Sequence, residues 1–292
     1  MDFHHPLFQS LALPLVLAFV ATGVLRALLG PGAGARWAAL GVPLALLAGI
    51  GWVLGWRLPP GGLTEKLPWV YLAAALLGAV LEALRADRKA QWLAAGLLWA
   101  VVIVALGQQP WVPRVGSWLV GMAVIGAVLY EVPSRADAVA MLVVAGVGLA
   151  LVSMMSGSAL LFELSLGLAA AVAGAALWLW PVPRISFGAG GLLAAVMAWL
   201  SLAQGTALLT SVRPGAVLLL AASFSACGIV RVLRHRLRHR LRRGEGRAWA
   251  EALVVAAVAA LWVAAALAIA HWAGPPRTGG GAPDNPYYTP KW

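Results

Sequence analysis

Long apolar stretches, each about the length of a membrane-spanning helix, recur along almost the whole chain of 292 residues. A bilayer core is crossed by about 20 apolar residues in helical form, and a helix satisfies its own backbone hydrogen bonds in lipid. Short links rich in proline and glycine, such as GPGAGAR and RLPPGGLTEKLP, separate the stretches. The pattern predicts about ten spans, at residues 8–30, 37–56, 69–86, 91–107, 116–132, 136–155, 158–180, 187–211, 215–234 and 247–272.

Composition indicates the same fold class. Only 11% of the residues are charged and 62% are hydrophobic, whereas soluble domains carry about 25% charged residues. We therefore expect an all-α polytopic integral membrane protein, with one transmembrane helical domain over 1–272 and a Pro/Gly-rich extramembrane tail over 273–292. The separation of the sixth and seventh spans depends on a turn at Gly157, where the sequence MMSGS contains few helix breakers.

The basic residues set the expected orientation, because cytoplasmic loops carry an excess of lysine and arginine. With ten spans, one set of loops holds most of them, and the stretch RVLRHRLRHRLRRGEGR at 231–247 supplies nearly all of the excess. This loop is predicted to be cytoplasmic, which places both termini on the outer side. The richness in alanine, glycine and arginine is typical of a high-GC bacterial genome, so we expect the bacterial inner membrane, with the termini in the periplasm.

The basic stretch allows several interpretations. Nucleic-acid binding requires only phosphate neutralisation, but a loop held against a membrane is poorly placed for it. His235 and His239 are one helical turn apart, yet no third metal ligand is near them in sequence. We interpret the stretch as a topology anchor that lies on anionic lipid, so that lipids are expected partners while nucleic acid, metal and other cofactors are not. The residues assigned to lipid are Arg231, Arg234, Arg236, Arg238, Arg240, Arg242 and Arg243.

A carboxylate inside a span is a candidate functional group, because buried charge in a membrane is costly. Glu163 lies within the seventh predicted span, and several hydroxyl and amide side chains share its predicted outer half of the membrane. A site of this kind would bind a cation, a proton or a polar head group. In the alternative, which the sequence favours, Glu163 lies at head-group depth and the hydroxyls bond their own helices. The candidate intramembrane polar site consists of Glu163, Ser165, Ser153, Gln204, Thr206 and Ser223.

Other polar and small residues have structural interpretations. Glu82 and Arg85 are three residues apart at a predicted helix end, which predicts an ion pair. Trp99, Trp199 and Trp262 fall near mid-membrane, where each indole N–H needs a partner. Small residues at or near four-residue spacing predict close helix packing at Gly51 with Gly55, Gly121 with Gly126, Gly167 with Ala171, and Ala170 with Gly174.

The sequence contains no motif of a hydrolase, metalloprotease or nucleotide-binding loop, so we do not expect an enzyme. The tail nevertheless ends in Tyr287, Tyr288 and Trp292, which are residue types favoured at protein interfaces. The first hypothesis is a non-catalytic accessory or scaffold subunit that binds a membrane protein partner. The alternative is a secondary transporter of a small apolar or amphipathic solute. A polar solute is not expected, because the predicted midplane of the membrane domain is largely apolar.

Overall fold

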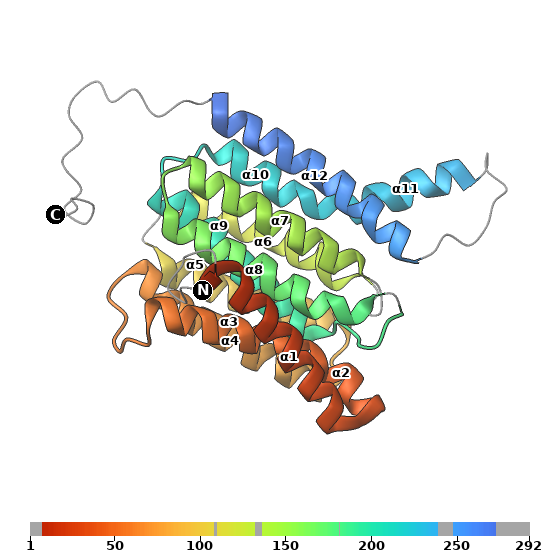
Figure 1. Cartoon of the computed structure of the whole chain (residues 1–292). Coiled ribbons are helices and arrows are strands. Elements are labelled where there is room, and N and C mark those ends of the chain that lie inside the picture. Colours follow the sequence, from red (N-terminus) through yellow and green to blue (C-terminus); the bar gives the residue numbers. More distant parts are fainter. Residues whose placement is uncertain (1–7, 108–109, 132–135, 181, 239–247, 273–292) are drawn as a thin grey trace, which may run out of the picture.

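The computed structural model describes residues 8–107, 110–131, 136–180, 182–238 and 248–272, and within them every regular element is a helix (Figure 1). Nine stretches in this part of the chain are long and apolar enough to cross a membrane. The chain therefore has the architecture of a multi-pass membrane protein, as the hydropathy pattern predicts. Its main helices are α1 (Leu13–Leu29), α3 (Gly41–Leu54), α4 (Leu63–Ala83), α5 (Arg88–Leu106), α6 (Trp111–Leu129), α7 (Asp137–Met155), α8 (Ala159–Ala176), α9 (Ala189–Leu209), α10 (Pro214–Ala222), α11 (Ala226–Arg238) and α12 (Ala248–Trp272).

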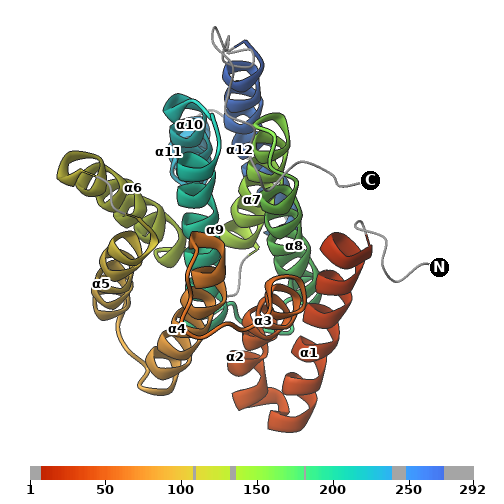
Figure 2. The ribbon, with the colours of Figure 1, turned by 90° about the vertical axis from the view of Figure 1, so that its left-hand side faces the viewer.

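The first of the nine stretches, Ser10–Leu54, is 45 residues long and contains both α1 and α3. Gly30 ends α1 with a φ of 75°, and the short helical turns between Gly30 and Leu40 reverse the chain. As a result, α3 packs alongside α1 (Figure 2). The two spans predicted in this region therefore correspond to two separate helices, while the exact number of membrane crossings stays a prediction.

The turn predicted at Gly157 is present. Gly157 adopts a φ of 81°, in the left-handed region that favours glycine. The next residue, Ser158, caps α8, because its hydroxyl accepts a hydrogen bond from the Leu161 N–H at 3.4 Å. The helices α7 and α8 are thus separate elements that pack against each other.

Helix α4 begins earlier than the hydropathy pattern predicts, at Leu63 instead of residue 69. The Glu65 carboxylate accepts hydrogen bonds from the Gly61 N–H at 2.7 Å and the Gly62 N–H at 3.3 Å. These bonds hold the chain that enters the helix, and a carboxylate in the first turn also suits the helix dipole. Capping chemistry therefore extends the helix beyond its apolar part.

Helix α9 lies at the centre of the molecule, in contact with α4, α5, α6, α7 and α8 (Figure 2). Every residue from Ala189 to Thr206 is buried. It packs closely against α4, where a Cβ added to Gly78 would lie 2.9 Å from the Ala189 carbonyl oxygen. Small residues allow this approach, so α4 and α9 form the tightly packed centre of the fold.

The ninth predicted span is interrupted. The 3-10 turn Ser223–Ser225 joins α10 to α11. The Ser223 hydroxyl donates to the Leu220 carbonyl and the Ser225 hydroxyl donates to the Ala222 carbonyl, both at 2.6 Å. Hydroxyls can take up carbonyls that a change of helix type leaves poorly bonded, so the interruption needs no outside partner.

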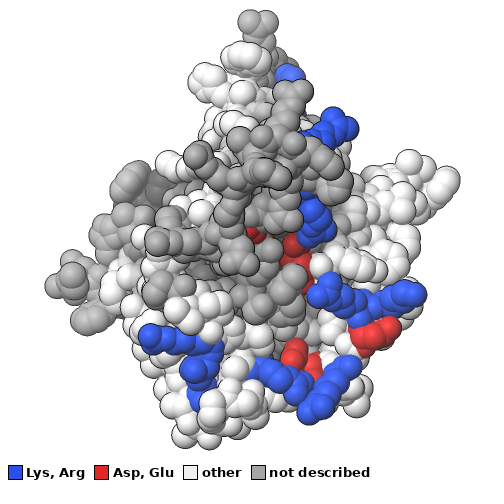
Figure 3. Space-filling model, turned by 90° about the vertical axis from the view of Figure 1, so that its right-hand side faces the viewer, with Lys and Arg blue, Asp and Glu red and all other residues white. Residues whose placement is uncertain are grey.

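Charged side chains gather at one end of the bundle. Helix α1 begins and α12 ends toward the same end of the bundle, on the left of Figure 1. Lysine and arginine side chains, with several carboxylates among them, gather at the other end, where α1 ends and α12 begins (Figure 3). We refer to this as the basic end. The side of the membrane that each end faces stays a prediction.

Candidate functional site

Three tryptophans tie α5 and α6 into one hairpin. The indole N–H of Trp92 donates to the Met122 carbonyl, that of Trp99 to the Ser117 carbonyl and that of Trp118 to the Gly96 carbonyl, each at 3.1 Å. A carbonyl oxygen has two lone pairs, so each acceptor can keep its own helical bond. The bonds run in both directions between the helices, which makes the hairpin a well-fixed unit.

Glycines on the facing helix make room for these rings. A Cβ on Gly121 would overlap the Trp99 indole, and a Cβ on Gly126 would lie 3.2 Å from Trp92 Nε1. The predicted close packing at Gly121 and Gly126 is therefore present, but the glycines admit aromatic rings and not a second backbone. By contrast, Gly174 faces the backbone of α1 at the Leu15 carbonyl, and Gly167 faces the Ser10 carbonyl in the turn before α1.

An apolar groove separates the α5–α6 hairpin from α10. We call it the α6–α10 groove; α9 forms its floor, and its volume is about 310 Å³. In Figure 2 the hairpin lies to the left of α10 and α11, and α9 lies below them. The residues that line the groove are Trp99, Pro113, Gly116, Ser117, Val120, Trp199, Leu200, Ala203, Gln204, Ala207, Pro214, Val217, Leu218 and Ala221.

The groove offers mainly apolar surface to an occupant. Both tryptophans in its lining already donate their indole N–H groups, Trp99 to Ser117 and Trp199 to the Ala145 carbonyl at 3.0 Å. Trp199 also packs edge-on against Phe224, with ring centroids 4.9 Å apart. Gln204, which is 8% exposed, is a polar residue in the floor of the groove. A groove of this size, with apolar walls and few polar groups, is typical of a small-molecule site.

The six residues of the predicted polar site lie in several different places in the structure. Ser153 and Thr206 lie together in the core, with their hydroxyl oxygens 3.1 Å apart. Ser223 donates to its own helix, as the alternative interpretation of the hydroxyls expects. Ser165 is buried, and its hydroxyl has no hydrogen-bond partner among the described residues. Gln204 belongs to the groove, so the six residues do not line a common cavity.

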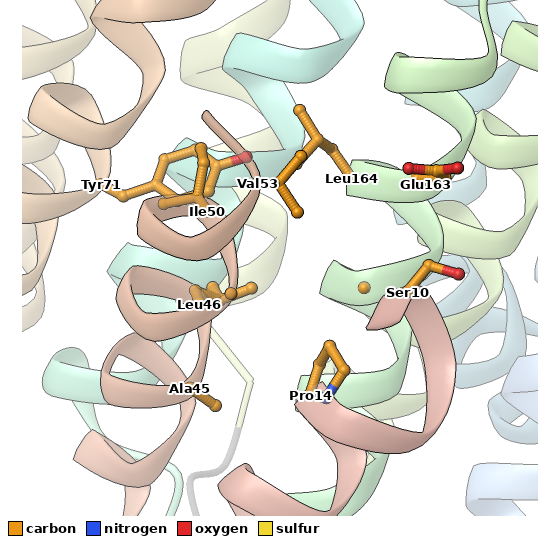
Figure 4. A pocket seen from close by; sticks show the side chains of 11 residues that line it. Ser10, Pro14, Ala45, Leu46, Ile50, Val53, Tyr71, Glu163 and Leu164 are labelled. Carbon is orange, nitrogen blue, oxygen red and sulfur yellow. The ribbon is translucent and has the colours of Figure 1, made fainter. Parts of the chain in front are cut away.

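Glu163 lines a separate small cavity between η1 (Phe8–Ala12), α1, α3 and α8 (Figure 4). The cavity has a volume of about 30 Å³, which is enough for a water molecule. Figure 4 shows Ser10 on the same side as Glu163 and the Tyr71 hydroxyl on the far side, beyond Val53 and Leu164. Glu163 is half-buried and has no ion pair or hydrogen bond with any described residue.

A second, larger cavity, lined by several charged side chains, lies at the basic end. Its volume is about 530 Å³, and we call it the basic cavity. Three arginines line it, Arg36, Arg85 and Arg88, together with one carboxylate, Glu82. Its other lining residues include Gln91 and the residues that lead into α9. The turns that join α4 to α5 and α8 to α9 therefore meet at this cavity.

The predicted ion pair of Glu82 with Arg85 is wrong. Glu82 instead interacts with Arg36, whose Nε lies 3.4 Å from Glu82 Oε1 and whose Nη2 donates to the Glu82 carbonyl at 3.1 Å. Arg85 lies beyond the last residue of α4, so the helical spacing behind the prediction does not apply to it. Sequence reasoning missed Arg36 because it is 46 residues from Glu82.

Arg85 occupies an unusual backbone position. The Ala86 N–H donates to the Leu81 carbonyl at 3.0 Å and the Arg85 N–H to the Glu82 carbonyl at 3.2 Å, which is the bonding pattern of a Schellman turn. Glycine usually occupies the position of Arg85 in this turn. Arg85 adopts a φ of 50° there, at a cost of about 1 kcal/mol for a residue with a Cβ. Its side chain has no partner among the described residues.

Part of the basic stretch is tied to the protein itself. Arg231 Nη2 lies 2.9 Å from both carboxylate oxygens of Glu131, a residue that is only 6% exposed. Arg236 is exposed. The side chains of Arg234 and Arg238, and the whole of Arg240, Arg242 and Arg243, lie outside the described residues, as do Tyr287, Tyr288 and Trp292 of the tail. Their assignments to lipid and to a partner protein stay predictions.

Neither a protein-family model nor a curated protein matches the chain. In the described part of the chain, no three histidine, cysteine, aspartate or glutamate side chains gather in a way that could hold a metal ion. The candidate sites are therefore the α6–α10 groove, the Glu163 cavity and the basic cavity. Sequence reasoning had signals for Gln204, for Glu163 and for the need of Trp99 for a hydrogen-bond acceptor, but none for the grouping of Arg36, Arg85 and Arg88.

Proposed function

We propose that this protein is a secondary transporter of a small amphipathic solute, which it binds in the α6–α10 groove. The groove itself carries the proposal: it is apolar, it extends to the buried central helix α9, and Gln204 is a polar residue in its floor. The apolar part of a solute would replace lipid against Trp99 and Trp199, while the Gln204 amide would select a polar group. An amphipathic substrate also agrees with the sparse polarity of the spans.

The arrangement around the groove supports movement of its wall. The indole bonds fix α5 to α6, whereas α6 meets α10 and the turn Ser223–Ser225 through few contacts. A change in the width of the groove would then move the hairpin as one body against α9 and α10. Rigid-body rocking of one bundle against another is a common means of alternating access.

A filled groove tests the proposal. Gly116 lines the groove and has no atom within 4 Å of an added Cβ, so Gly116→Phe should occupy the groove without disturbing the fold. Proteoliposomes that contain the purified chain are assayed with two impermeant amphipathic probes of opposite charge, ethidium and carboxyfluorescein. We expect at least one probe to cross faster than in protein-free liposomes and its rate to fall about tenfold in Gly116→Phe, which corresponds to about 1.4 kcal/mol.

Gly228→Phe is the matched control, because Gly228 on α11 has the same open space and does not line the groove. Its rate should equal that of the wild type. Glu163→Gln adds a second arm: if Glu163 carries a coupling proton, uptake driven by a pH gradient is lost while exchange without a gradient persists. Equal rates in Gly116→Phe and Gly228→Phe would refute the groove as the binding site.

The accessory or scaffold subunit remains the competing proposal. It depends on the aromatic tail, which lies outside the described residues. Gentle detergent extraction from the native membrane, followed by identification of co-purifying proteins, separates the two proposals. A defined partner that is released when residues 273–292 are deleted supports the subunit, and a lone chain that transports a probe supports the transporter.

A further inference from the structure

The basic cavity contains more positive than negative charge, and its charges are unequally engaged. Arg36 is paired with Glu82, and one nitrogen of Arg88, Nη1, donates to the Tyr130 carbonyl at 2.7 Å. The side chain of Arg85 has no hydrogen bond or ion pair with any described residue. Two guanidinium groups, those of Arg85 and Arg88, therefore remain to interact with whatever enters the cavity.

We propose that the basic cavity binds a phosphate-type oxyanion, carried either by a lipid head group or by a soluble molecule. Guanidinium groups present planar pairs of N–H donors that match phosphate oxygens. The volume of about 530 Å³ admits a phosphate group together with the molecule that bears it. This site is distinct from the α6–α10 groove and does not depend on the proposed transport.

The start of α9 adds to the positive potential of the cavity. Gly188 precedes the helix and provides no side-chain cap, and both Gly188 and Ala189 line the cavity. The first backbone N–H groups of a helix have no partner within it, and they favour anions. The Glu82 carboxylate lies against Gly188, but it also neutralises Arg36, so an incoming anion still meets Arg85 and Arg88.

The backbone of Arg85 is also unusual. A turn that favours glycine holds an arginine in the left-handed region, and the side chain has no described partner that would repay the strain. Strained positions of this kind cluster at functional sites. A ligand that bonds to the guanidinium group accounts for an arginine here, because the side chain then has a role that glycine cannot fill.

The experiment uses the purified full-length chain in detergent and two probes. In the first arm, the melting temperature is followed during titration with sodium phosphate and, separately, with sodium chloride at matched ionic strength. A ligand that binds only the folded state raises the melting temperature as its concentration rises. In the second arm, native mass spectrometry counts the phosphatidylglycerol molecules retained from a mixture with phosphatidylcholine.

Two substitutions at Arg85 are compared with one control. Arg85→Gly suits the turn and should fold at least as well as the wild type, with a higher melting temperature when no ligand is present. Arg85→Gln removes the charge and keeps the Cβ. Arg184→Gln is the control, because Arg184 is an exposed arginine in the link between α8 and α9 that does not line the cavity.

We expect the loss of Arg85 to weaken the affinity for the bound probe about tenfold, because one charge-assisted contact is removed, while Arg184→Gln leaves it unchanged. An effect of phosphate in the first arm indicates a soluble anion, and retention of phosphatidylglycerol alone indicates a lipid head group. The proposal is overturned if the wild type responds to neither probe, or if the Arg85 variants bind like Arg184→Gln.

Discussion

At the scale of single residues, the described structure depends on places where one extra atom would not fit. Gly121 and Gly126 lie beside the Trp99 and Trp92 indoles, and Gly96 lies beside the Met122 side chain. Each indole also bonds to the backbone of the opposite helix. Because membrane helices gain little from hydrophobic burial against each other, such packing and hydrogen bonds contribute much of their association.

This dependence predicts a contrast between two alanine substitutions on α6. Gly121→Ala places a Cβ on the Trp99 ring and should lower the free energy of unfolding by about 1–3 kcal/mol. The reason is that the ring must move away and lose its hydrogen bond to the Ser117 carbonyl. Gly116→Ala, five residues earlier in open space, should change it by less than about 0.5 kcal/mol. Both are measured by unfolding in mixed detergent micelles, and equal effects of the two substitutions would contradict the role of the indole.

Residue patterns revealed the need for some of these contacts but not the partners. The mid-membrane position of Trp99 and Trp199 indicates that each indole requires an acceptor, and both have one. Trp262 has no hydrogen-bond partner among the described residues. Which carbonyl accepts depends on which helices are neighbours, and one apolar stretch resembles another too closely to reveal this. Arg85 is a different case. The predicted ion pair with Glu82 assumed that the helix continues through Arg85, whereas α4 ends two residues earlier, at Ala83.

At the scale of elements, α11 is attached to the rest of the fold by charge as well as by packing. Arg231 on α11 bonds both oxygens of Glu131, which follows α6 directly and is nearly buried. The two residues are 100 positions apart, and the sequence assigned Arg231 to lipid alone. A hydrogen bond between two charged groups is stronger than one between neutral groups, so this pair helps to hold α11 against the end of α6.

The pair predicts an asymmetric double-mutant cycle. Arg231→Gln leaves the nearly buried Glu131 carboxylate unpaired and should destabilise the protein by about 1–3 kcal/mol. Glu131→Gln should cost less, because the freed arginine is largely exposed and can reach water. The double variant should be more stable than Arg231→Gln alone.

Unfolding of the four proteins in detergent measures the cycle. Arg236→Gln is the control, because Arg236 lies on the same helix and is exposed. A double variant whose loss equals the sum of the two single losses would show that the pair contributes no coupling.

At the scale of the whole molecule, hydropathy was sufficient for the helical membrane fold and for where most helices lie, since lipid restricts a spanning backbone so strongly. It was not sufficient for the cavities. The basic cavity combines Arg36, the turn at Arg85 and the entry to α9, which are far apart in sequence. The α6–α10 groove depends on how far the α5–α6 hairpin stands from α10. Both cavities arise from the way the helices are arranged. The same pattern of apolar stretches is compatible with many such arrangements.

The basic residues at one end of the bundle predict how the molecule sits in the membrane. In a Cys227→Ala background, Leu58→Cys introduces a thiol at a residue that is 76% exposed, in the link between α3 and α4, away from the basic end. Lys89→Cys introduces one at the exposed start of α5, at the basic end. Because basic loops stay cytoplasmic, an impermeant maleimide should label Leu58→Cys in intact cells and Lys89→Cys only after permeabilisation. The reverse pattern would place the basic cavity outside, where cytoplasmic phosphate compounds cannot reach it, and equal labelling would indicate that the chain inserts in both directions.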